Sequence, residues 1–326
     1  MSITETIEFL QGLQPDERIV VCGHVRPDGD CIGSTLALVR SLRLAGLNAY
    51  PMLADNKRAP EFYDWLEGFD DFLTPEEVGS WSEVDVFIVV DSPVSKRLSG
   101  AQPILERATR SLVIDHHPEL EDFGDVRFID PTTASCTQMV WDLLHQAGFP
   151  IDRDVATACY AGLVSDTGRF MFTNTTADTL RAAAEMVEVG VDINDVNVRL
   201  FSSKSAEALE LEALMLERMM ILNNGKVTAS WLTQSDFETT GARRDEAENI
   251  IDIIRTLKGS EVAILVTFGD SSTRVSLRSK TDFSVAAIAE EFGGGGHQAA
   301  AGVNWPDRTD DLSTILDELT PRLPGA

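Results

Sequence analysis

Side chains that can ligate metal ions follow three short apolar runs, at residues 19–22, 86–90 and 112–114. In chain order these side chains are His24, Asp28 and Asp30, then Asp91, then Asp115, His116 and His117. Short apolar runs that end in polar residues with proline or glycine are typical of buried strands entering loops. Because ligands bind outside the carboxyl ends of parallel strands, we expect these side chains to converge at one edge of a sheet.

Histidine and aspartate at this density favour a hydrolytic site with two metal ions. Imidazole and carboxylate suit Mn²⁺ and similar divalent ions. Two such ions side by side can hold a bridging hydroxide and neutralise charge on a phosphoryl group under attack. A single aspartate at a strand end is more often a turn residue or a helix cap, and a single pair of histidines is equally ordinary. The whole set, however, favours ligation over these alternatives.

Four segments of the chain resemble the DHH-family phosphoesterases, and the resemblance extends over nearly its whole length. They are His24-x-x-Pro27-Asp28-Gly29-Asp30-x-x-Gly33-Ser34, Asp115-His116-His117, Asp166-Thr167-Gly168 and Gly294-Gly295-Gly296-His297-x-x-Ala300-Ala301-Gly302. The length and the glycine-rich motif are most similar to the nanoRNase/pAp phosphatase branch. This resemblance implies hydrolysis of short oligoribonucleotides, of pAp (3′-phosphoadenosine 5′-phosphate) and, in some members, of linear or cyclic dinucleotides.

The resemblance also implies a ligand set for two divalent metal ions. The expected ligands are His24, Asp28 and Asp91 for one metal, and Asp30, Asp91, His116 and Asp166 for the other. Asp91 would bridge the two ions. Histidine ligation and the resemblance favour Mn²⁺, with Mg²⁺ or Co²⁺ as alternatives.

Within the Asp115-His116-His117 segment, the resemblance implies other roles for His117 and Asp115. His117 would face the scissile phosphate instead of a metal. Asp115 would orient the histidines, because ligating imidazoles usually need such an acceptor. With the bridging Asp91, these two residues form the catalytic set that the resemblance implies.

A basic strand is expected in the C-terminal part of the chain. Apolar and polar residues alternate over residues 273–280, so a strand would place Arg274, Ser276, Arg278 and Lys280 on one face. This face would be basic in an otherwise acidic protein. A solvated strand face is the alternative, but the neighbouring glycine motif favours contact with substrate, above all by Arg278.

The glycine run that ends in His297 favours a phosphate and nucleotide clamp. It follows an apparent helix, and a loop of Gly294, Gly295 and Gly296 would let backbone N–H groups approach an anion closely. A flexible turn is the alternative. Together with Arg278, His297 is the strongest candidate for contact with the substrate phosphate.

Arg97 follows Asp91 by six residues and could also reach a phosphate. An exposed arginine in a salt bridge is the favoured interpretation of this residue.

Composition limits the class of partner. A formal charge of −26 repels long polyanions, so the expected partners are short single-stranded RNA or nucleotide phosphoesters and not long duplex nucleic acid. No apolar run approaches the roughly 20 residues that span a membrane, and the first residues lack the features of a signal peptide. We therefore expect a cytoplasmic protein without membrane partners, with its four cysteines reduced and mostly buried.

Strand and helix patterns alternate up to about residue 190, which predicts an α/β fold with a mostly parallel sheet and flanking helices. We expect a catalytic, metal-binding domain at 1–190, a hinge at 191–205 and a smaller α/β substrate-binding domain at 206–326. The last helix of the first domain is predicted over 177–189. The second domain is predicted to begin with a helix that reaches about Leu222.

The residues predict a metal-dependent phosphoesterase, and the family resemblance implies that it hydrolyses short oligoribonucleotides to mononucleotides, pAp to AMP, or both. Hydrolysis of cyclic di-AMP or linear dinucleotides as the main role, and inorganic pyrophosphatase or polyphosphatase activity, are the alternatives. A RecJ-like exonuclease is disfavoured because such chains are larger and carry further nucleic-acid-binding modules. A non-catalytic nucleotide-binding regulator is the least favoured alternative. Homodimerisation is plausible from the family resemblance.

Overall fold

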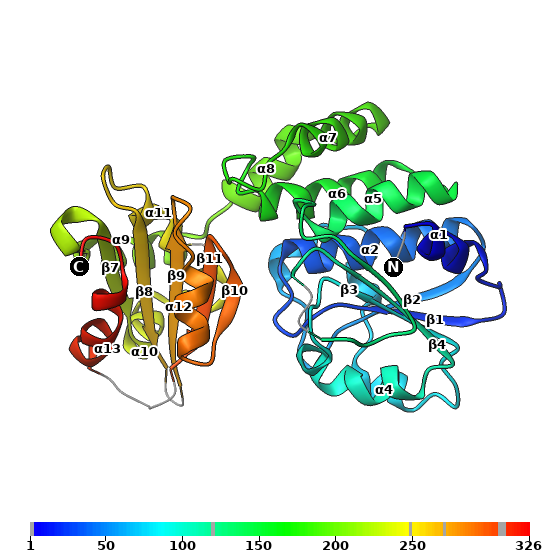
Figure 1. Ribbon diagram of the computed structural model, residues 1–326, viewed down its shortest axis with the longest axis horizontal. Helices are drawn as coiled ribbons and strands as arrows, with labels where there is room; N and C mark the ends of the chain where they lie inside the picture. The colour runs from blue at the N-terminus through cyan, green and yellow to red at the C-terminus, as the bar shows by residue number, and fades with distance from the viewer. Residues whose placement is uncertain (1–2, 119–120, 248–249, 270–271, 306–310) are drawn as a thin grey trace. The chain divides into compact units, whose positions relative to one another are not determined.

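The computed structural model describes residues 3–118, 121–247, 250–269, 272–305 and 311–326 (Figure 1). The chain divides into two compact units, Met1–Ser202 and Ser203–Ala326. Each unit contains one β-sheet with helices packed against it. An α/β architecture with a parallel sheet in the first unit confirms the predicted fold class.

The sheet of the first unit has five parallel strands in the order β2-β1-β3-β4-β5. The strands are β1 (Arg18–Cys22), β2 (Asn48–Met52), β3 (Val86–Val90), β4 (Arg110–Asp115) and β5 (Val126–Ile129). The strand order reverses direction between β1 and β3, and loops at such a switch point open a crevice at the carboxyl ends of the strands. Cys22 pairs with Val89, and Val90 with Ile114, so the ends of β1, β3 and β4 lie together.

Helices cover both faces of this sheet, as parallel strands require. They are α1 (Ile3–Gln11), α2 (Gly29–Leu44), α3 (Pro75–Gly79), α4 (Gln102–Arg107), α5 (Cys136–Ala147), α6 (Arg153–Asp166), α7 (Ala177–Val189) and α8 (Ile193–Phe201). Alternate residues of β3 face opposite ways. Ile88 packs into the core formed with α2, α5 and α6, while Phe87 and Val89 pack towards α3 and α4. Both faces are therefore buried, which explains the continuous apolar runs in the sequence.

Glycines allow α2 and α6 to approach closely. A Cβ atom at Gly33 of α2 would lie 2.4 Å from the carbonyl oxygen of Ala158 in α6, and one at Gly162 of α6 would lie 3.0 Å from the Cα atom of Asp30 in α2 and 2.4 Å from the Cγ2 atom of Thr137 in α5. Because real Cβ atoms do not make such contacts, any larger residue would push these helices apart. This close packing brings the C-terminus of α6 next to the N-terminus of α2.

The sheet of the second unit is mixed, with the order β10-β11-β9-β8-β7-β6. Its strands are β6 (Met220–Leu222), β7 (Val227–Leu232), β8 (Val262–Phe268), β9 (Thr273–Ser279), β10 (Gly295–His297) and β11 (Ala300–Asn304). Only β7 and β8 are parallel among the paired strands described. The helices are α9 (Ala206–Glu217), α10 (Gln234–Thr240), α11 (Ile251–Arg255), α12 (Val285–Glu291) and α13 (Leu312–Leu319). Helices α12 and α13 pack on one face and α9, α10 and α11 on the other.

Two local predictions in the second unit are wrong. The first helix ends at Glu217, and Met220–Leu222 instead form β6, because they pair with β7 across a turn at Asn223 and Asn224. The glycine run is not simply a loop, since Gly295–His297 form β10 and pair with β11. A Cβ atom at Gly294 would lie 2.3 Å from the carbonyl oxygen of Gly302, so the glycines permit close approach of the two strands.

The segment predicted as a hinge is largely helical. Helix α8 occupies Ile193–Phe201 and belongs to the first compact unit, which ends at Ser202. The preceding helix, α7, spans the predicted residues, Ala177–Val189, because Thr176 caps its start and Gly190 ends it.

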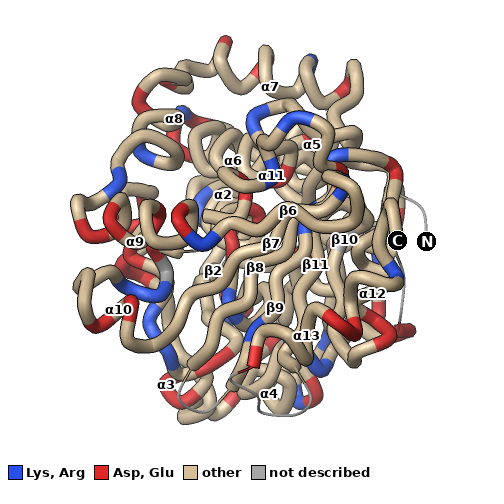
Figure 2. Tube along the Cα trace, turned by 90° about the vertical axis from the view of Figure 1, so that its left-hand side faces the viewer, with Lys and Arg blue, Asp and Glu red and all other residues tan. Residues whose placement is uncertain are grey.

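Acidic residues are spread over both units, with several on α9 and α10 (Figure 2). All four cysteines are buried and free, as the sequence predicts. Within the described residues, no helix has both the length and the apolar character needed to cross a bilayer.

Candidate metal centre

Asp91 lies at the centre of a buried group of histidines and aspartates in the first unit. Its carboxylate follows β3 directly, and its backbone adopts a left-handed conformation, with φ of 54°. Oδ2 of Asp91 lies 3.3 Å from Nε2 of His24. Oδ1 lies 3.5 Å from Nε2 of His116 and 3.4 Å from Nδ1 of His117. The two carboxylate oxygens therefore face different histidines, as a bridging ligand would require.

His24 lies two residues beyond β1, with its ring held by the backbone. Its Nδ1 donates a hydrogen bond to the carbonyl oxygen of Val25 at 2.9 Å. This bond leaves Nε2 directed at Asp91, with Oδ2 of Asp28 at 3.9 Å. A ring with Nδ1–H bonded to a carbonyl presents the lone pair of Nε2 to a metal ion.

Asp28 is the N-cap of α2. Its Oδ1 accepts hydrogen bonds from the backbone N–H groups of Asp30 and Cys31, each at 3.1 Å. The alternative considered for a single aspartate, a helix cap, thus applies to Asp28. Its other oxygen still faces His24, so capping does not prevent ligation through Oδ2.

Asp30 lies in the first turn of α2 and points at the N-terminus of α5. Its carboxylate accepts hydrogen bonds from the backbone N–H groups of Cys136 and Thr137, at 2.6 and 2.8 Å, and from the hydroxyl of Thr137 at 2.6 Å. The positive end of a helix and three donors favour a carboxylate at this position. Asp30 is consequently fixed in orientation before any ion binds.

His116 connects Asp91, Asp30 and Asp166. Its Nε2 lies 3.3 Å from Oδ2 of Asp166 and 3.7 Å from Oδ2 of Asp30. Asp166 is the last residue of α6, and Asn174 donates a hydrogen bond to its carbonyl oxygen at 3.1 Å. The packing of α6 against α2 therefore places Asp166, which has no strand of its own, beside the strand ends.

His117 and Asp115 form a separate pair. The Nδ1 atom of His117 donates to Oδ1 of Asp115 at 2.8 Å, and the backbone N–H of His117 donates to the same oxygen at 3.2 Å. Asp115 is the last residue of β4 and is fully buried. This geometry fits the role that the family resemblance implies for Asp115, that of a hydrogen-bond acceptor that orients a histidine.

Protonation in this group follows from burial and crowding. Burial and the nearby charge of Asp91 raise the pKa of Asp30 to about 7, and burial raises the pKa of Asp166 well above its usual value. Burial opposes protonation of His116, but the carboxylates of Asp91, Asp166 and Asp30 around its ring together outweigh this effect and raise the pKa of His116 well above its usual value. Because the pKa values of Asp30 and Asp166 are raised, bound protons reduce the repulsion between these carboxylates when no cation is bound.

The residues present fit divalent metal ions. Oδ1 of Asp91 is buried, and no described residue gives it a hydrogen bond of normal geometry. Three groups of potential ligands have all their ligand atoms within 4.8 Å of one another. They are His24, Cys31 and Asp91; Asp91, His116 and His117; and Asp30, His116 and Asp166. Nitrogen and oxygen donors of these types bind Mn²⁺, Zn²⁺ and related ions.

Cys31, one of the four buried cysteines, reaches this centre. Its Sγ donates a weak hydrogen bond to the carbonyl oxygen of His24 at 3.9 Å. A Cβ atom at Gly23 would lie 2.1 Å from this sulfur, so the thiol fills the space beside a glycine. Burial and the charges of Asp91 and Asp28 raise the pKa of Cys31, which opposes thiolate formation.

Arg97 also reaches the edge of the centre. The backbone N–H of Val25, next to His24, donates to the carbonyl oxygen of Arg97 at 2.9 Å. Arg97 is partly buried, and no carboxylate among the described residues forms an ion pair with it. The expectation of an exposed arginine in a salt bridge is therefore wrong, because the loop after β3 turns this residue towards β1.

The second unit places the predicted basic residues as follows. Side chains of β9 alternate between buried and outward-facing, so Arg274, Ser276 and Arg278 share one face. The Nζ of Lys280, just beyond the strand, donates to the carbonyl oxygen of Leu257 at 2.6 Å. Arg278 pairs with Ala300 of β11 across the sheet. The side chain of His297 lies outside the described part of the structure.

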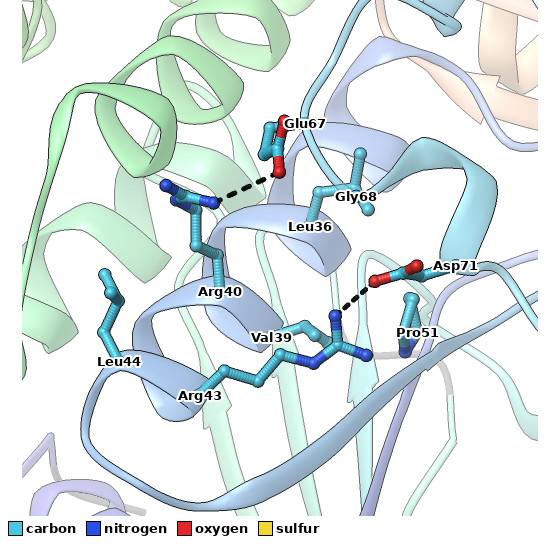
Figure 3. Close-up of a pocket in the computed structure, with 9 residues that line it drawn as sticks. All are labelled: Leu36, Val39, Arg40, Arg43, Leu44, Pro51, Glu67, Gly68 and Asp71. Carbon is cyan, nitrogen blue, oxygen red and sulfur yellow. Dashed lines mark hydrogen bonds and ion pairs between the residues drawn. The ribbon is translucent and has the colours of Figure 1, made fainter.

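A surface pocket of about 180 Å³ lies elsewhere in the first unit (Figure 3). Arg40 and Arg43 of α2 line it and pair with Glu67 and Asp71, respectively. Ten residues of helix separate Arg40 from Asp30, a distance of about 15 Å along the helix axis. This pocket is therefore separate from the candidate metal centre. Carboxylates also neutralise both of its arginines.

Comparisons with known proteins agree with this architecture. The model of the DHH family, N-terminal domain, matches residues 18–163, and that of the DHHA1 domain matches residues 224–323. The chain is 32% identical to the bifunctional oligoribonuclease and PAP phosphatase NrnA of Thermus thermophilus, over 98% of this chain and 94% of that protein. It is 26% identical to the protein of the same name from Bacillus subtilis, over 95% and 98% of the two chains.

A solved structure of an exopolyphosphatase-related protein from Bacteroides fragilis has a similar fold. The TM-score is 0.89 at 23% identity, over 98% of this chain and 95% of that chain. Similarity at this identity supports the fold of the chain.

Proposed function

This chain belongs to the DHH family, and we propose that it is a metal-dependent phosphoesterase that hydrolyses short oligoribonucleotides to mononucleotides and pAp to AMP. The similarity over 98% of the chain to a relative named as an oligoribonuclease and PAP phosphatase supports this choice of substrates. The observation that carries the proposal is the position of Asp91, with one carboxylate oxygen facing His24 and the other facing His116 and His117.

The proposed cofactor is a pair of divalent ions, with Mn²⁺ as the preferred ion. His24, Asp28 and Asp91 would hold one ion, and Asp30, Asp91, His116 and Asp166 would hold the other. When bound, such ions act as Lewis acids towards phosphoryl oxygens and lower the pKa of water. Imidazole in the set favours Mn²⁺ over Mg²⁺, which prefers oxygen ligands and retained waters.

The residues of the chain would position and neutralise the reacting groups. Asp30 and His24 are held by backbone groups, so little ordering would be needed when the centre fills. His117, fixed by Asp115 through Nδ1, would donate a hydrogen bond to the scissile phosphate through Nε2 in the imidazolium form, in which both ring nitrogens carry protons. Stabilisation of charge by preoriented donors is usually a large part of phosphoryl-transfer catalysis.

The second unit would bind the rest of the substrate. Arg274 and Arg278 share the outward face of β9, and guanidinium groups suit phosphate oxygens. We include Gly294, Gly295, Gly296 and His297 in this proposed clamp, with Lys280 as a contact at the end of β9. Its hydrogen bond to Leu257 would have to break for Lys280 to reach a phosphate.

Two further properties stay predictions from the sequence. They are location in the cytoplasm and the formation of a homodimer. Binding of long duplex nucleic acid is not expected for a chain with a formal charge of −26.

A Mn²⁺-dependent hydrolysis panel tests the proposed function. It compares pAp, pApA, a ladder of short RNA, cyclic di-AMP and pyrophosphate, with Asp91→Ala as the blank. We expect release of mononucleotides from pApA and short RNA, and of AMP from pAp. Strong preference for cyclic di-AMP would select the alternative main role, and pyrophosphate as the sole substrate would overturn the proposal. A chain that binds nucleotides but hydrolyses none would support the regulator instead.

A further inference from the structure

We propose that Arg26 and Arg97 bind a second phosphate group of the substrate, distinct from the phosphate that is cleaved. This inference rests on the proposed function and adds a selection rule to it. The enzyme would prefer substrates that carry a phosphate next to the scissile one, such as a dinucleotide with a terminal phosphate, over the same substrate without it.

The two arginines lie on loops joined by a hydrogen bond. Arg26 is in the loop between His24 and Asp28, and Arg97 is in the first turn after the loop that follows Asp91. The backbone N–H of Val25 donates to the carbonyl oxygen of Arg97 at 2.9 Å, which connects the loops. Both arginines therefore border the metal centre on its His24 side.

Arg97 differs from the other partly buried arginines of the first unit. Within the described part of that unit these are Arg40, Arg97, Arg110 and Arg127. Arg40 pairs with Asp152, Arg110 with Glu17, and Arg127 with Asp122. Arg97 has no carboxylate within ion-pair distance among the described residues, in a chain whose formal charge is −26. A partly buried guanidinium without an internal anion is suited to an anion supplied by a ligand.

The same two loops contain unusual backbone conformations. Arg26 has φ of 54°, Asp91 has 54° and Ser99 has 46°, all in the left-handed region that residues with a side chain rarely adopt. Such residues concentrate at functional sites, where the surrounding structure holds them. Arg26, in this left-handed turn, is exposed and lies in the sequence between two candidate metal ligands, His24 and Asp28.

The position of the arginines separates their phosphate from the scissile one. Arg97 lies on the side of Asp91 where Oδ2 faces His24, because its carbonyl oxygen accepts the hydrogen bond from Val25, the residue next to His24. His117, the candidate for the scissile phosphate, lies on the opposite side, near Oδ1. A short nucleotide that places its scissile phosphate near His117 would thus bring a neighbouring phosphate towards Arg26 and Arg97. Arginine forms paired hydrogen bonds with phosphate oxygens, which would fix this end of the substrate.

The test compares two dinucleotides that differ by one phosphate, pApA and ApA. Arg97→Gln and Arg26→Gln are measured beside the wild type with Mn²⁺. For Arg97→Gln we expect KM for pApA to rise about tenfold or more, since a hydrogen bond to a charged group is lost. The kinetics with ApA should change by less than about twofold. Arg97→Lys should restore part of the loss, because it keeps the charge.

Arg153→Gln is the matched control for the change in charge. Arg153 is exposed at the start of α6, and Asp166 ends this helix about 20 Å away along its axis. Its kinetics should equal those of the wild type with both dinucleotides. Thermal midpoints and calorimetric Mn²⁺ binding of every variant should match the wild type, because the arginines are not proposed as ligands. Equal loss with pApA and ApA, or no loss with either, would overturn the inference and leave the proposed function standing.

A binding measurement decides the inference even if the wild type hydrolyses neither dinucleotide. Titration calorimetry, on protein freed of metal by a chelator, compares the binding affinity of AMP with that of adenosine, which lacks the phosphate. We expect Arg97→Gln to weaken AMP binding about tenfold and to leave adenosine unchanged. Unchanged AMP affinity would overturn the inference, whereas failure of hydrolysis alone would reject only the proposed function.

Discussion

Oδ1 of Asp30 accepts hydrogen bonds from both the backbone N–H and the hydroxyl of Thr137, at 2.8 and 2.6 Å. This pair connects the first turn of α2 to the N-terminus of α5. These hydrogen bonds orient Asp30, a candidate metal ligand. Among the described hydrogen bonds, Thr137 contacts no other candidate ligand. The hydroxyl also lowers the pKa of Asp30 against the opposing effect of burial.

Thr137→Val removes the hydroxyl and keeps the shape of the side chain. The pKa of Asp30, already raised to about 7, should rise further, so a larger fraction of the carboxyl is protonated at pH 7. Mn²⁺ must displace this proton, and we expect affinity at pH 7 to fall about tenfold. Titration calorimetry measures the change. Thr157→Val is the control, since the hydroxyl of Thr157 donates to the carbonyl oxygen of Arg153 on an exposed part of α6. Unchanged affinity in Thr137→Val would contradict the role of this hydrogen bond.

Gly162→Ala should displace α6 from α2. The added Cβ would lie 2.4 Å from Cγ2 of Thr137 and 3.0 Å from Cα of Asp30, so the helix that ends in Asp166 must move. Overpacking of this kind costs about 1–3 kcal/mol, and Mn²⁺ affinity should fall as well. Gly79→Ala is the control, because no atom lies within 4 Å of its added Cβ. Denaturant unfolding of both variants measures the difference, and equal stability would show that the helices can separate without cost.

The strand ends of the first unit could be predicted from the sequence because local patterns determine them. Apolar runs buried on both faces identify β1, β3 and β4, and turn residues mark where each ends. Asp166 could not be placed in this way. Its position depends on the contact of α6 with α2 through Gly33 and Gly162, which are distant in sequence from each other.

Other differences have similar physical causes. Met220–Leu222 continue an apolar, helix-favouring pattern, yet pairing with β7 makes them a strand. The glycine run suggests a loop, but close contact between Gly294 and the carbonyl oxygen of Gly302 fits an edge strand. Tertiary pairing overrides local preference in both segments. The absence of an acidic partner for Arg97 among the described residues is likewise a tertiary property, which no spacing in the sequence reveals.

Acid should destabilise the second unit through Asp236. Its hydrogen bonds with Arg218 lower its pKa from 3.8 to about 2. Because the folded pKa is depressed, the unfolded state binds a proton first, and the stabilisation present above pH 4 is lost as pH falls from about 4 to about 2. Its size is about 2 kcal/mol, at 1.36 kcal/mol per pKa unit.

Calorimetric unfolding of the full chain at pH 5 and pH 2.5 checks this loss. Asp236→Asn should lower the midpoint of one transition at pH 5, and the difference from the wild type should shrink at pH 2.5. A pH-independent difference would contradict the linkage to the pKa of Asp236.

Removal of metal should destabilise the first unit alone. An ion at 100 times its dissociation constant stabilises the folded state by about 2.7 kcal/mol per site. We therefore expect EDTA to lower the midpoint of one calorimetric transition and Mn²⁺ to restore it. In Asp91→Ala, neither addition should shift that midpoint. The transition affected by Asp236→Asn should respond to neither reagent, and a shift of both transitions would contradict a metal centre confined to the first unit.

Anomalous X-ray scattering from crystals grown with Mn²⁺ tests the central claim most directly. We predict two peaks about 3.5–4 Å apart, the spacing of paired catalytic metals, with Asp91 between them. His24 and Asp28 should contact one peak, and Asp30, His116 and Asp166 the other. Absence of any peak beside Asp91, or a peak ligated without Asp91, would contradict this account of the protein.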